Sequence, residues 1–312
     1  MRIAVYGVGG VGGYFGGRLA LVGHDVTFIA RGTHLQAMQQ QGLRVTSIDG
    51  DFTIQPTHAV DDPAQIGPVD VVLVAVKAWQ VPEIAPTILP LIGPETLVLP
   101  LQNGVEAHTQ LAAVLGPTHV LAGLARIISF ISAPGQIEHA AFPPYIALGE
   151  LDNQRTKRVQ RLQQTLHEAG INAEIPDDII TAVWGKFLFI AAFSGVSAVT
   201  RAPAGIIRAQ AATRAMLEAA MHEVHAVAVA QGVALPASAI PNALAAIDAV
   251  PPTATPSMQR DILAGRPSEL EAQQGAMVRL GQTTNIPTPV NTMLYAALLP
   301  QELRARGSIN FS

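Results

Sequence analysis

The chain has 312 residues, 49% hydrophobic and 13% charged, with a net charge of −4 and no cysteine. This length accommodates two domains, and the small charged fraction requires extensive burial, for which we expect a homodimer interface. The absence of a basic run argues against a nucleic-acid partner, and the absence of cysteine excludes disulfides and thiol chemistry and fits the cytoplasm.

The first predicted element is an apolar strand over residues 2–6, followed by a glycine-rich turn and a helix over residues 13–22. The turn, Gly7-Val8-Gly9-Gly10-Val11-Gly12, has the spacing G-x-G-x-x-G. In this pattern Gly7 allows a tight turn, Gly9 admits the phosphates and Gly12 lets the helix pack closely. A glycine turn without a ligand is the alternative, but the order of strand, turn and helix favours a dinucleotide site at the helix N-terminus.

The second predicted strand, residues 25–30, ends in Ala30-Arg31-Gly32. Chains that bind NAD usually carry Asp or Glu there, to accept hydrogen bonds from the ribose hydroxyls. Arg31 instead supplies a planar cation suited to a 2′-phosphate, so the sequence favours NADPH over NADH. The alternative is a solvated loop arginine.

The rest of the first half alternates strands and helices. We expect a helix at 33–41, a hairpin of 43–47 with 52–56, buried strands at 70–76 and 96–99, and a helix at 105–115. Antiparallel strands between 120 and 149, broken at Pro134-Gly135 and Pro143-Pro144, are expected to extend the same sheet. A helix at 153–169 and a strand at 171–175 complete a Rossmann-type α/β domain over residues 1–176.

Residues 177–312 are predicted to be entirely helical and to form the substrate and dimerisation domain. Asp177 or Asp178 can cap a helix that continues to about residue 199. This stretch approaches membrane-spanning length, but Lys186 in its middle favours a buried helix and no membrane. Residues 205–231 are expected to form the longest helix, followed by helices at 241–250, 257–263, 268–281 and 289–299. We expect the substrate in a cleft between the domains.

Lys186 is the strongest catalytic candidate, because it lies in the apolar run Trp184-Gly185-Lys186-Phe187-Leu188. A buried lysine can serve as the general acid that a ketone reduction needs. The alternative is a lysine that extends from a surface helix to water. Glu269 is its natural partner, although spacing alone does not separate Glu269 from Glu271.

Polar residues that follow predicted strands are also candidates. Asn103 and Lys77 both come directly after a strand, at the edge where a cofactor binds. A simple Asn-Gly turn and a solvated lysine are the alternatives. His222 and His225 have a spacing that can hold a metal, but a solvated helix face explains them better, so no metal site is predicted.

Taken together, these motifs resemble the ketopantoate reductase family, the 2-dehydropantoate 2-reductases. The resemblance spans nearly the whole chain and is carried by Gly7-x-Gly9-x-x-Gly12, Arg31, Val76-Lys77, Leu101-Gln102-Asn103-Gly104, Trp184-x-Lys186, Ser257-Met258-x-x-Asp261 and Arg266-Pro267-Ser268-Glu269. It implies NADPH-dependent reduction of 2-dehydropantoate to pantoate, in pantothenate synthesis.

The resemblance also implies roles for single residues. Lys186 would be the general acid and Glu269 would orient it together with the substrate hydroxyl. Ser257 would hold the substrate carboxylate, Asn103 would lie between nicotinamide and substrate, and Lys77 would contact cofactor or substrate.

Three positions depart from the family pattern, since Ile190, Ser194 and Ala204 stand where related reductases carry Asn. Positions 186, 190 and 194 share one helix face, which should line the substrate pocket. A missing hydrogen bond in a dry pocket costs on the order of 1–3 kcal/mol, enough to alter substrate choice. A paralogue acting on another 2-oxo or hydroxy acid is therefore the second hypothesis, and an NADPH-binding sensor without chemistry is the third.

Overall fold

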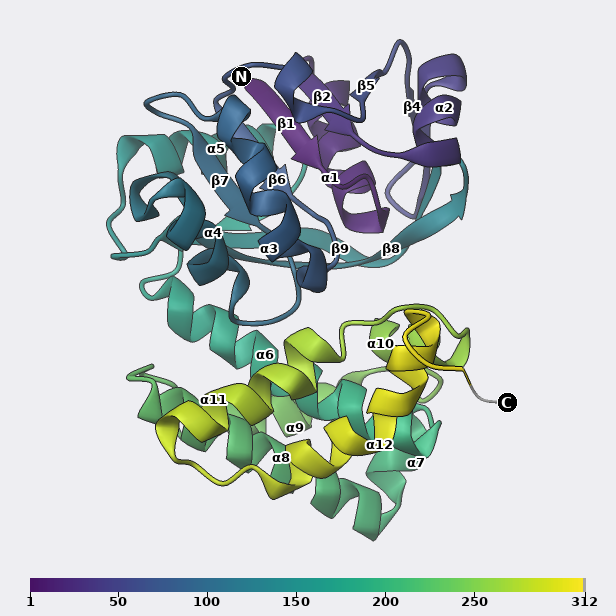
Figure 1. Ribbon diagram of the computed structural model, residues 1–312, viewed down its shortest axis with the longest axis vertical. Helices are drawn as coiled ribbons and strands as arrows, with labels where there is room; N and C mark the ends of the chain where they lie inside the picture. The colour runs from purple at the N-terminus through teal and green to yellow at the C-terminus, as the bar shows by residue number, and fades with distance from the viewer. Residues whose placement is uncertain (311–312) are drawn as a thin grey trace. The chain divides into compact units, whose positions relative to one another are not determined.

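The computed structural model describes residues 1–310 and divides into two compact units (Figure 1). The first unit comprises Met1–Gln102 and Ala107–Ile179, and the second comprises Asn103–Glu106 and Ile180–Ser312. The division lies at Ile179, three residues beyond the predicted boundary at 176. The sequence did not indicate that the short segment Asn103–Glu106 would group with the second unit.

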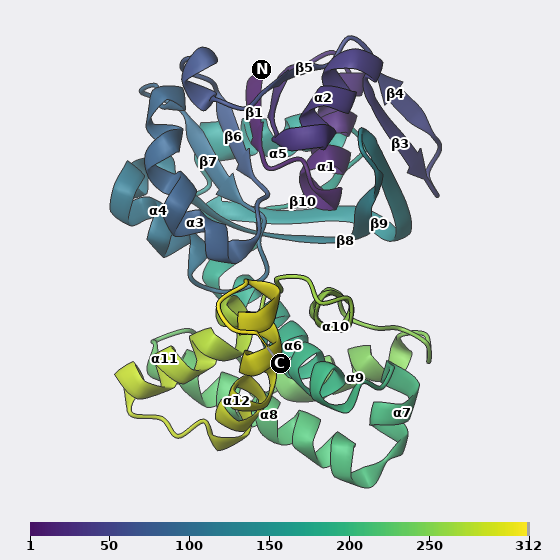
Figure 2. The same ribbon diagram turned by 45° about the vertical axis from the view of Figure 1, so that its right-hand side comes forward.

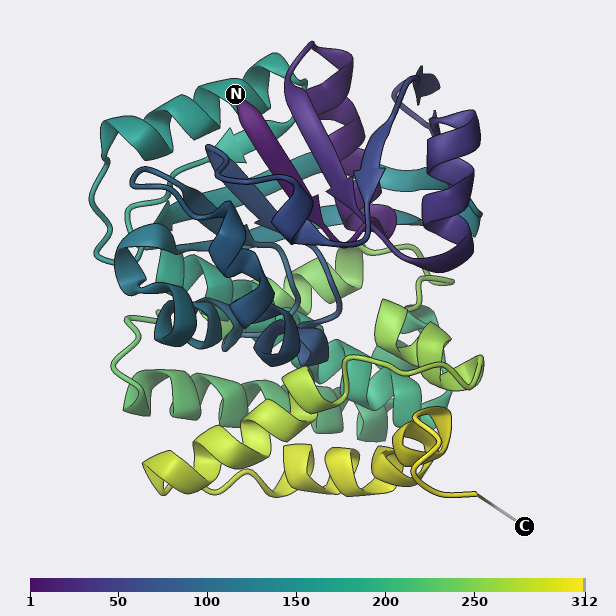
Figure 3. The same ribbon diagram turned by 45° about the horizontal axis from the view of Figure 1, so that its top comes forward.

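The first unit contains a five-stranded parallel sheet in the order β5-β2-β1-β6-β7. All four pairings are parallel, and the neighbours β1 and β2 can be followed as purple arrows in Figure 3. The strands are β1 (Arg2–Tyr6), β2 (Asp25–Ile29), β5 (His58–Val60), β6 (Val71–Val74) and β7 (Leu97–Pro100). Every residue of β6 and β7 is buried, as expected for parallel strands covered on both faces. The predicted α/β fold of Rossmann type is confirmed.

A second sheet has the order β10-β9-β3-β4, with β8 paired to β9. Its strands are β3 (Leu43–Ser47), β4 (Phe52–Ile54), β8 (Leu121–Ala133), β9 (Gln136–Glu150) and β10 (Asn172–Glu174). The hairpin of β3 and β4 is confirmed. The prediction that the antiparallel strands extend the parallel sheet is wrong, because they form this separate sheet instead.

Helix α1 (Gly10–Leu21) explains the separation of the two sheets, since it lies between them (Figure 2). On one side Gly16 is so close to Val5 and Phe28 that an added Cβ would lie 2.7 Å or less from each. On the other side a Cβ on Gly13 would lie 2.7 Å from Ile137. Small residues on two faces therefore let a sheet pack on each side of one helix.

The β8–β9 hairpin turns at Pro134-Gly135, as predicted, but Pro143-Pro144 does not end a strand. Both prolines lie within β9, where the pairing with β8 shifts register between Arg126 and Ile128. Phe142 just before them has φ 63°, so the chain absorbs the two prolines in a bulge.

The other helices of the first unit are α2 (Gly32–Gln41), α3 (Val81–Ile84), α4 (Ala107–Leu115) and α5 (Lys157–Glu168). Short 3₁₀ turns occur at Pro63–Gln65, Ala78–Gln80, Ala85–Leu91 and Pro117–His119.

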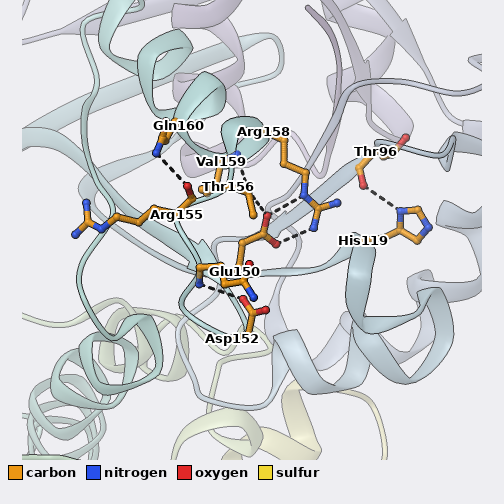
Figure 4. Close-up of polar contacts among 10 residues, drawn as sticks. Thr96, His119, Glu150, Asp152, Arg155, Thr156, Arg158, Val159 and Gln160 are labelled. Atoms are coloured by element: carbon orange, nitrogen blue, oxygen red, sulfur yellow. Dashed lines mark hydrogen bonds and ion pairs between the residues drawn. The ribbon is translucent and has the colours of Figure 1, made fainter.

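Helix α5 begins four residues later than predicted, because its cap is set by a tertiary contact (Figure 4). The Thr156 hydroxyl accepts the N–H of Val159 and donates to the buried carboxylate of Glu150 at 2.6 Å. Arg158 donates to both oxygens of Glu150, each at 2.8 Å. The end of β9 thereby determines where the helix starts.

The second unit is helical in the part that the structure describes. Its elements are α6 (Ile179–Thr200), α7 (Ala204–Ala209), α8 (Ala211–Ala230), α9 (Ala239–Ala249), α10 (Ser257–Leu263), the π-helical turn η5 (Glu271–Gly275), α11 (Ala276–Thr284) and α12 (Pro289–Ala305). By length and hydropathy α6 could span a membrane, but 61% of its most apolar window is buried within the protein, as in the core helix of a soluble protein.

The single long helix predicted over 205–231 is wrong, since the chain breaks at Gln210 between α7 and α8. The Thr213 hydroxyl donates to the carbonyl oxygen of Ile207 at 2.6 Å. Arg208 donates to the carbonyls of Ile247, Asp248 and Val250 at the end of α9. These side-chain contacts stabilise a corner that contains neither Gly nor Pro, and α6, at 22 residues, is longer than α8, at 20.

Candidate active site

The glycine turn after β1 contains glycines required by the fold and one that is not. Gly7 has φ +95°, and a Cβ there would lie 2.7 Å from the backbone nitrogen of Val76. A Cβ on Gly12 would lie 2.0 Å from the carbonyl oxygen of Gly7. An added Cβ on Gly9 meets nothing within 4 Å and its φ is −77°, so the fold itself would accept alanine there. The glycine at position 9 therefore indicates a ligand that must approach the backbone.

The N-terminus of α1 is suited to that ligand. Gly9 is the N-cap and its carbonyl accepts the N–H of Gly13 at 2.8 Å. The N–H groups of Gly10, Val11 and Gly12 precede the first intrahelical bond and point outward from the helix end. The first turn carries no acidic side chain, so the positive end of the helix dipole is available to a pyrophosphate. The residues present fit a dinucleotide.

Three further polar residues follow strands of the parallel sheet and so lie at its carboxyl edge. Arg31 follows β2 as the exposed N-cap of α2, and Lys77 follows β6 and is half-buried. Gln102 follows β7, and its amide donates to the carbonyls of Val74 and Val76 at 2.9 and 3.1 Å. Gln102 thus fixes the end of β6 immediately before Lys77, a structural role that the sequence motif did not reveal.

Lys186 lies in the second unit and is the one charged residue of α6. Its side chain is half-buried and its neighbours in sequence include Trp184 and Phe187, whose rings are packed edge to face with centroids 5.6 Å apart. Further along the same helix face, Ile190 is half-buried and Ser194 is fully buried. The Ser194 hydroxyl has no hydrogen-bond partner among the described protein groups. The predicted face therefore runs from a partly accessible lysine into the core of the unit.

The structure distinguishes Glu269 from Glu271, which spacing alone left equivalent. Glu271 is bound by the guanidinium of Arg279 and by the hydroxyl of Tyr295 at 2.8 Å. Burial and the hydrogen bond to Glu271 raise the pKa of Tyr295. Glu269 is only 6% exposed and lies in an irregular segment before η5, so the helix predicted over 268–281 begins later than expected. Glu271 thus has a structural role, and Glu269 stays the catalytic candidate that the family resemblance implies.

Asn103 belongs to the short segment Asn103–Glu106, which contacts the π-helical turn η5. Gly104 has φ +130°, and an added Cβ would lie 3.1 Å from the carbonyl oxygen of Ala272 in η5. Arg279, which binds Glu271, also binds Glu106 at 2.8 Å. Asn103 and Glu269 therefore both flank the π-helical turn, although they are far apart in the sequence.

Ser257 begins α10 and is half-buried. The chain returns from α10 to Glu269 through a loop held by Arg266, whose guanidinium donates to Asp261 at 2.9 Å. Asp261, in the motif that begins at Ser257, thus forms an ion pair with Arg266, in the motif that ends at Glu269. Ala204, the third departure from the family pattern, is fully buried at the start of α7, and its N–H donates to Ala254.

Family models for "Ketopantoate reductase PanE/ApbA" and its C-terminal domain match residues 3–153 and 178–302. A 2-dehydropantoate 2-reductase of Mesorhizobium japonicum is 33% identical, with 93% of this chain and 94% of that protein covered. The chain belongs to the ketopantoate reductase family. It is therefore an oxidoreductase, and its dinucleotide is a nicotinamide dinucleotide.

Other members of the family show similar likeness. The 2-dehydropantoate 2-reductase of a Nostoc species is 32% identical, covering 95% of this chain and 94% of that one. The crystal structure of a ketopantoate reductase family protein from Ralstonia eutropha has a TM-score of 0.90 at 31% identity and covers 98% and 100% of the two chains. A D-mandelate dehydrogenase solved with NADH and anilino(oxo)acetate has a TM-score of 0.89 at 22% identity, covering 98% and 99% of the two chains, which shows a shared fold.

The two histidines of α8 in this ketopantoate reductase family member, His222 and His225, lie beside hydrogen bonds within the second unit. The Nε2 of His225 lies 3.1 Å from the carbonyl oxygen of Leu235. Glu223, beside His222, accepts the N–H groups of Val290 and Asn291 at the start of α12. Within residues 1–310 no group of three His, Cys, Asp or Glu residues is placed to hold a metal.

Proposed function

We propose that this oxidoreductase reduces 2-dehydropantoate to pantoate with NADPH. The single observation that supports the chemistry best is Lys186, the one charged residue of the apolar helix α6, in the same unit as the buried Glu269. Relatives that carry the name 2-dehydropantoate 2-reductase support the substrate.

The residues of the first unit would hold the cofactor. The N–H groups of Gly10, Val11 and Gly12 would donate to the pyrophosphate, and the exposed Arg31 would pair with a 2′-phosphate. Lys77 would contact the cofactor from the end of β6. When bound, NADPH supplies the hydride that adds to the carbonyl carbon of the substrate.

The residues of the second unit would complete the reaction. The ammonium group of Lys186 would donate its proton to the substrate oxygen as that oxygen gains negative charge. Glu269 would accept hydrogen bonds from this ammonium and from the substrate hydroxyl. Ser257 would donate to the substrate carboxylate, and the Asn103 amide would orient the carbonyl.

Ile190, Ser194 and Ala204 favour a second candidate, a reductase of another 2-oxo acid. Ile190 offers no hydrogen-bonding group, and both Ser194 and Ala204 are fully buried. A pocket that lacks these amides would bind an acid with an apolar side chain at a smaller desolvation cost.

The test is turnover of NADPH, followed by absorbance, with 2-dehydropantoate and with branched 2-oxo acids that lack its hydroxyl. The highest kcat/KM for 2-dehydropantoate is expected. A higher value for another acid would overturn the substrate, and no oxidation of NADPH with any acid would favour the binding-only sensor.

We also propose that the chain forms a homodimer in the cytoplasm. Several large apolar side chains of the second unit are exposed, which supports an interface: Ile206, Val229, Leu263 and Met293. Light scattering of the purified protein should give twice the chain mass, and a mass of one chain would contradict the proposal.

A further inference from the structure

A buried carboxylate of α12 binds the residue that precedes Glu269. Glu302 is 3% exposed, and its two oxygens accept the N–H of Ser268 at 3.0 and 3.1 Å. The Ser268 hydroxyl donates to the same carboxylate at 2.5 Å. Arg306, the C-cap of α12, donates its Nε–H to Glu302 at 2.7 Å. One carboxylate thus holds both the backbone and the side chain of Ser268.

The same serine also holds the residue after Glu269. Its hydroxyl oxygen accepts the N–H of Leu270 at 3.2 Å. Leu270 is fully buried, in a cluster with Met258 and Leu298. The backbone on both sides of Glu269 is therefore held by hydrogen bonds of Ser268, which is itself bound by Glu302.

Stability alone does not explain a carboxylate at this place. Glu302 lies in the last turn of α12, near the negative end of the helix dipole, where an acidic side chain is disfavoured. Burial of a charge adds a desolvation penalty, which the ion pair with Arg306 and the hydrogen bonds from Ser268 must offset. The carboxylate instead fixes one backbone conformation of residues 268–270.

We propose that Glu302 is a positioning residue, which acts through Ser268 to fix the carboxylate of Glu269 for catalysis. This inference rests on the proposed role of Glu269. Charge-assisted hydrogen bonds have defined lengths and directions, and a catalytic group displaced by about 1 Å can lose about 100-fold in rate.

The experiment compares Glu302→Gln with a matched control on the other end of the same helix. Glu223 accepts the N–H of Val290 at 2.7 Å and that of Asn291 at 2.9 Å, so Glu223→Gln also removes a carboxylate clamp on α12. Both variants should unfold at a lower temperature. Only Glu302→Gln should lower kcat, by about 10- to 100-fold, with an unchanged Kd for NADPH.

A double-mutant cycle with Glu269→Gln separates positioning from a general loss of structure. If Glu302 acts through Glu269, adding Glu302→Gln to Glu269→Gln should lower kcat no further. A full additional loss in the double variant, or equal losses of kcat in Glu302→Gln and Glu223→Gln, would overturn the proposal. Should Glu302→Gln fail to fold, Ser268→Ala removes the hydroxyl that links both sides of Glu269 and replaces it in the cycle.

Amide hydrogen exchange keeps this test separate from the proposed function. Faster exchange at Ser268 and Leu270 is expected in Glu302→Gln and not in Glu223→Gln, whichever 2-oxo acid the wild-type protein reduces. Unchanged exchange at both amides would overturn the inference, whereas a wild-type protein that is inactive on every 2-oxo acid would overturn the proposed function.

Discussion

The glycine turn of the first unit comes from one short stretch of backbone, whereas the candidate residues of the second unit are side chains gathered from distant segments. Gly7 to Gly12, the turn proposed to bind the dinucleotide, are six consecutive residues. Asn103, Lys186, Ser257 and Glu269 belong to four separate segments of the second unit. A local backbone conformation can be recognised from spacing, but a set of side chains depends on how the helices pack.

The two regions also differ in whether the fold itself requires their characteristic residues. The fold needs glycine at position 12, because a Cβ there would overlap the carbonyl oxygen of Gly7. It does not need glycine at position 9, where an added Cβ meets nothing within 4 Å, whereas Lys186 is notable as the one charged residue of the apolar helix α6. Residues without a structural reason are the ones that point to function.

The largest expected effect comes from removing the side chain of Lys186. Lys186→Ala should lower kcat by about 1,000-fold, because the substrate oxygen loses its proton donor. Its Kd for NADPH should be unchanged, since the glycine turn proposed to bind the dinucleotide lies in the first unit. Lys157→Ala, at an exposed position of α5, is the control. Steady-state kinetics and fluorescence titration measure both effects, and a wild-type kcat in Lys186→Ala would show that another group is the acid.

Two alanine substitutions in the glycine turn would separate structural from functional glycines. Gly12→Ala should destabilise the protein by about 3 kcal/mol, because neither the strand nor the helix can move away easily. Gly9→Ala should keep the unfolding temperature and weaken NADPH binding, since its Cβ would occupy space that the phosphates need. Thermal unfolding and titration test the pair, and tight NADPH binding by Gly9→Ala would argue against a pyrophosphate at this turn.

Arg31→Ala tests which nicotinamide dinucleotide is preferred. Loss of a charge-assisted contact to the 2′-phosphate should raise the Kd for NADPH by about 10- to 100-fold. The Kd for NADH should change little, because NADH lacks that phosphate. Equal weakening for both dinucleotides would mean that Arg31 does not read the 2′-phosphate.

The smallest effect is expected near the break between α7 and α8, where the sequence predicted one long helix. Arg214 donates to Asp248 and lowers the pKa of that carboxyl. A lowered pKa contributes stability above the unfolded-state value of about 3.9, and this stability is lost as the pH falls through the folded-state pKa. Because the pair is partly exposed, Asp248→Asn should cost less than about 1 kcal/mol near neutral pH. Urea unfolding should show this difference vanish in acid, and a difference that persists there would exclude the ion pair as its cause.

Three errors show where local patterns were insufficient. The antiparallel strands were assigned to the wrong sheet, because the glycines on a second face of α1 indicate close packing without saying what packs there. The break at Gln210 depends on Thr213 and on contacts of Arg208 with α9, which no local signal encodes. The start of α5 depends on Glu150, a residue of the preceding strand.

The sequence by itself determined the glycine turn between the first strand and helix, the alternation of strands and helices and the apolar helix around Lys186. Each depends on neighbouring residues, whose spacing sets backbone conformation and the buried face. Only the tertiary structure decided that Glu271 pairs with Arg279 and Tyr295, that Asn103 joins the helical unit, and that Glu302 holds the segment carrying Glu269. These contacts join residues that are far apart along the chain, so they exist only once the helices have packed.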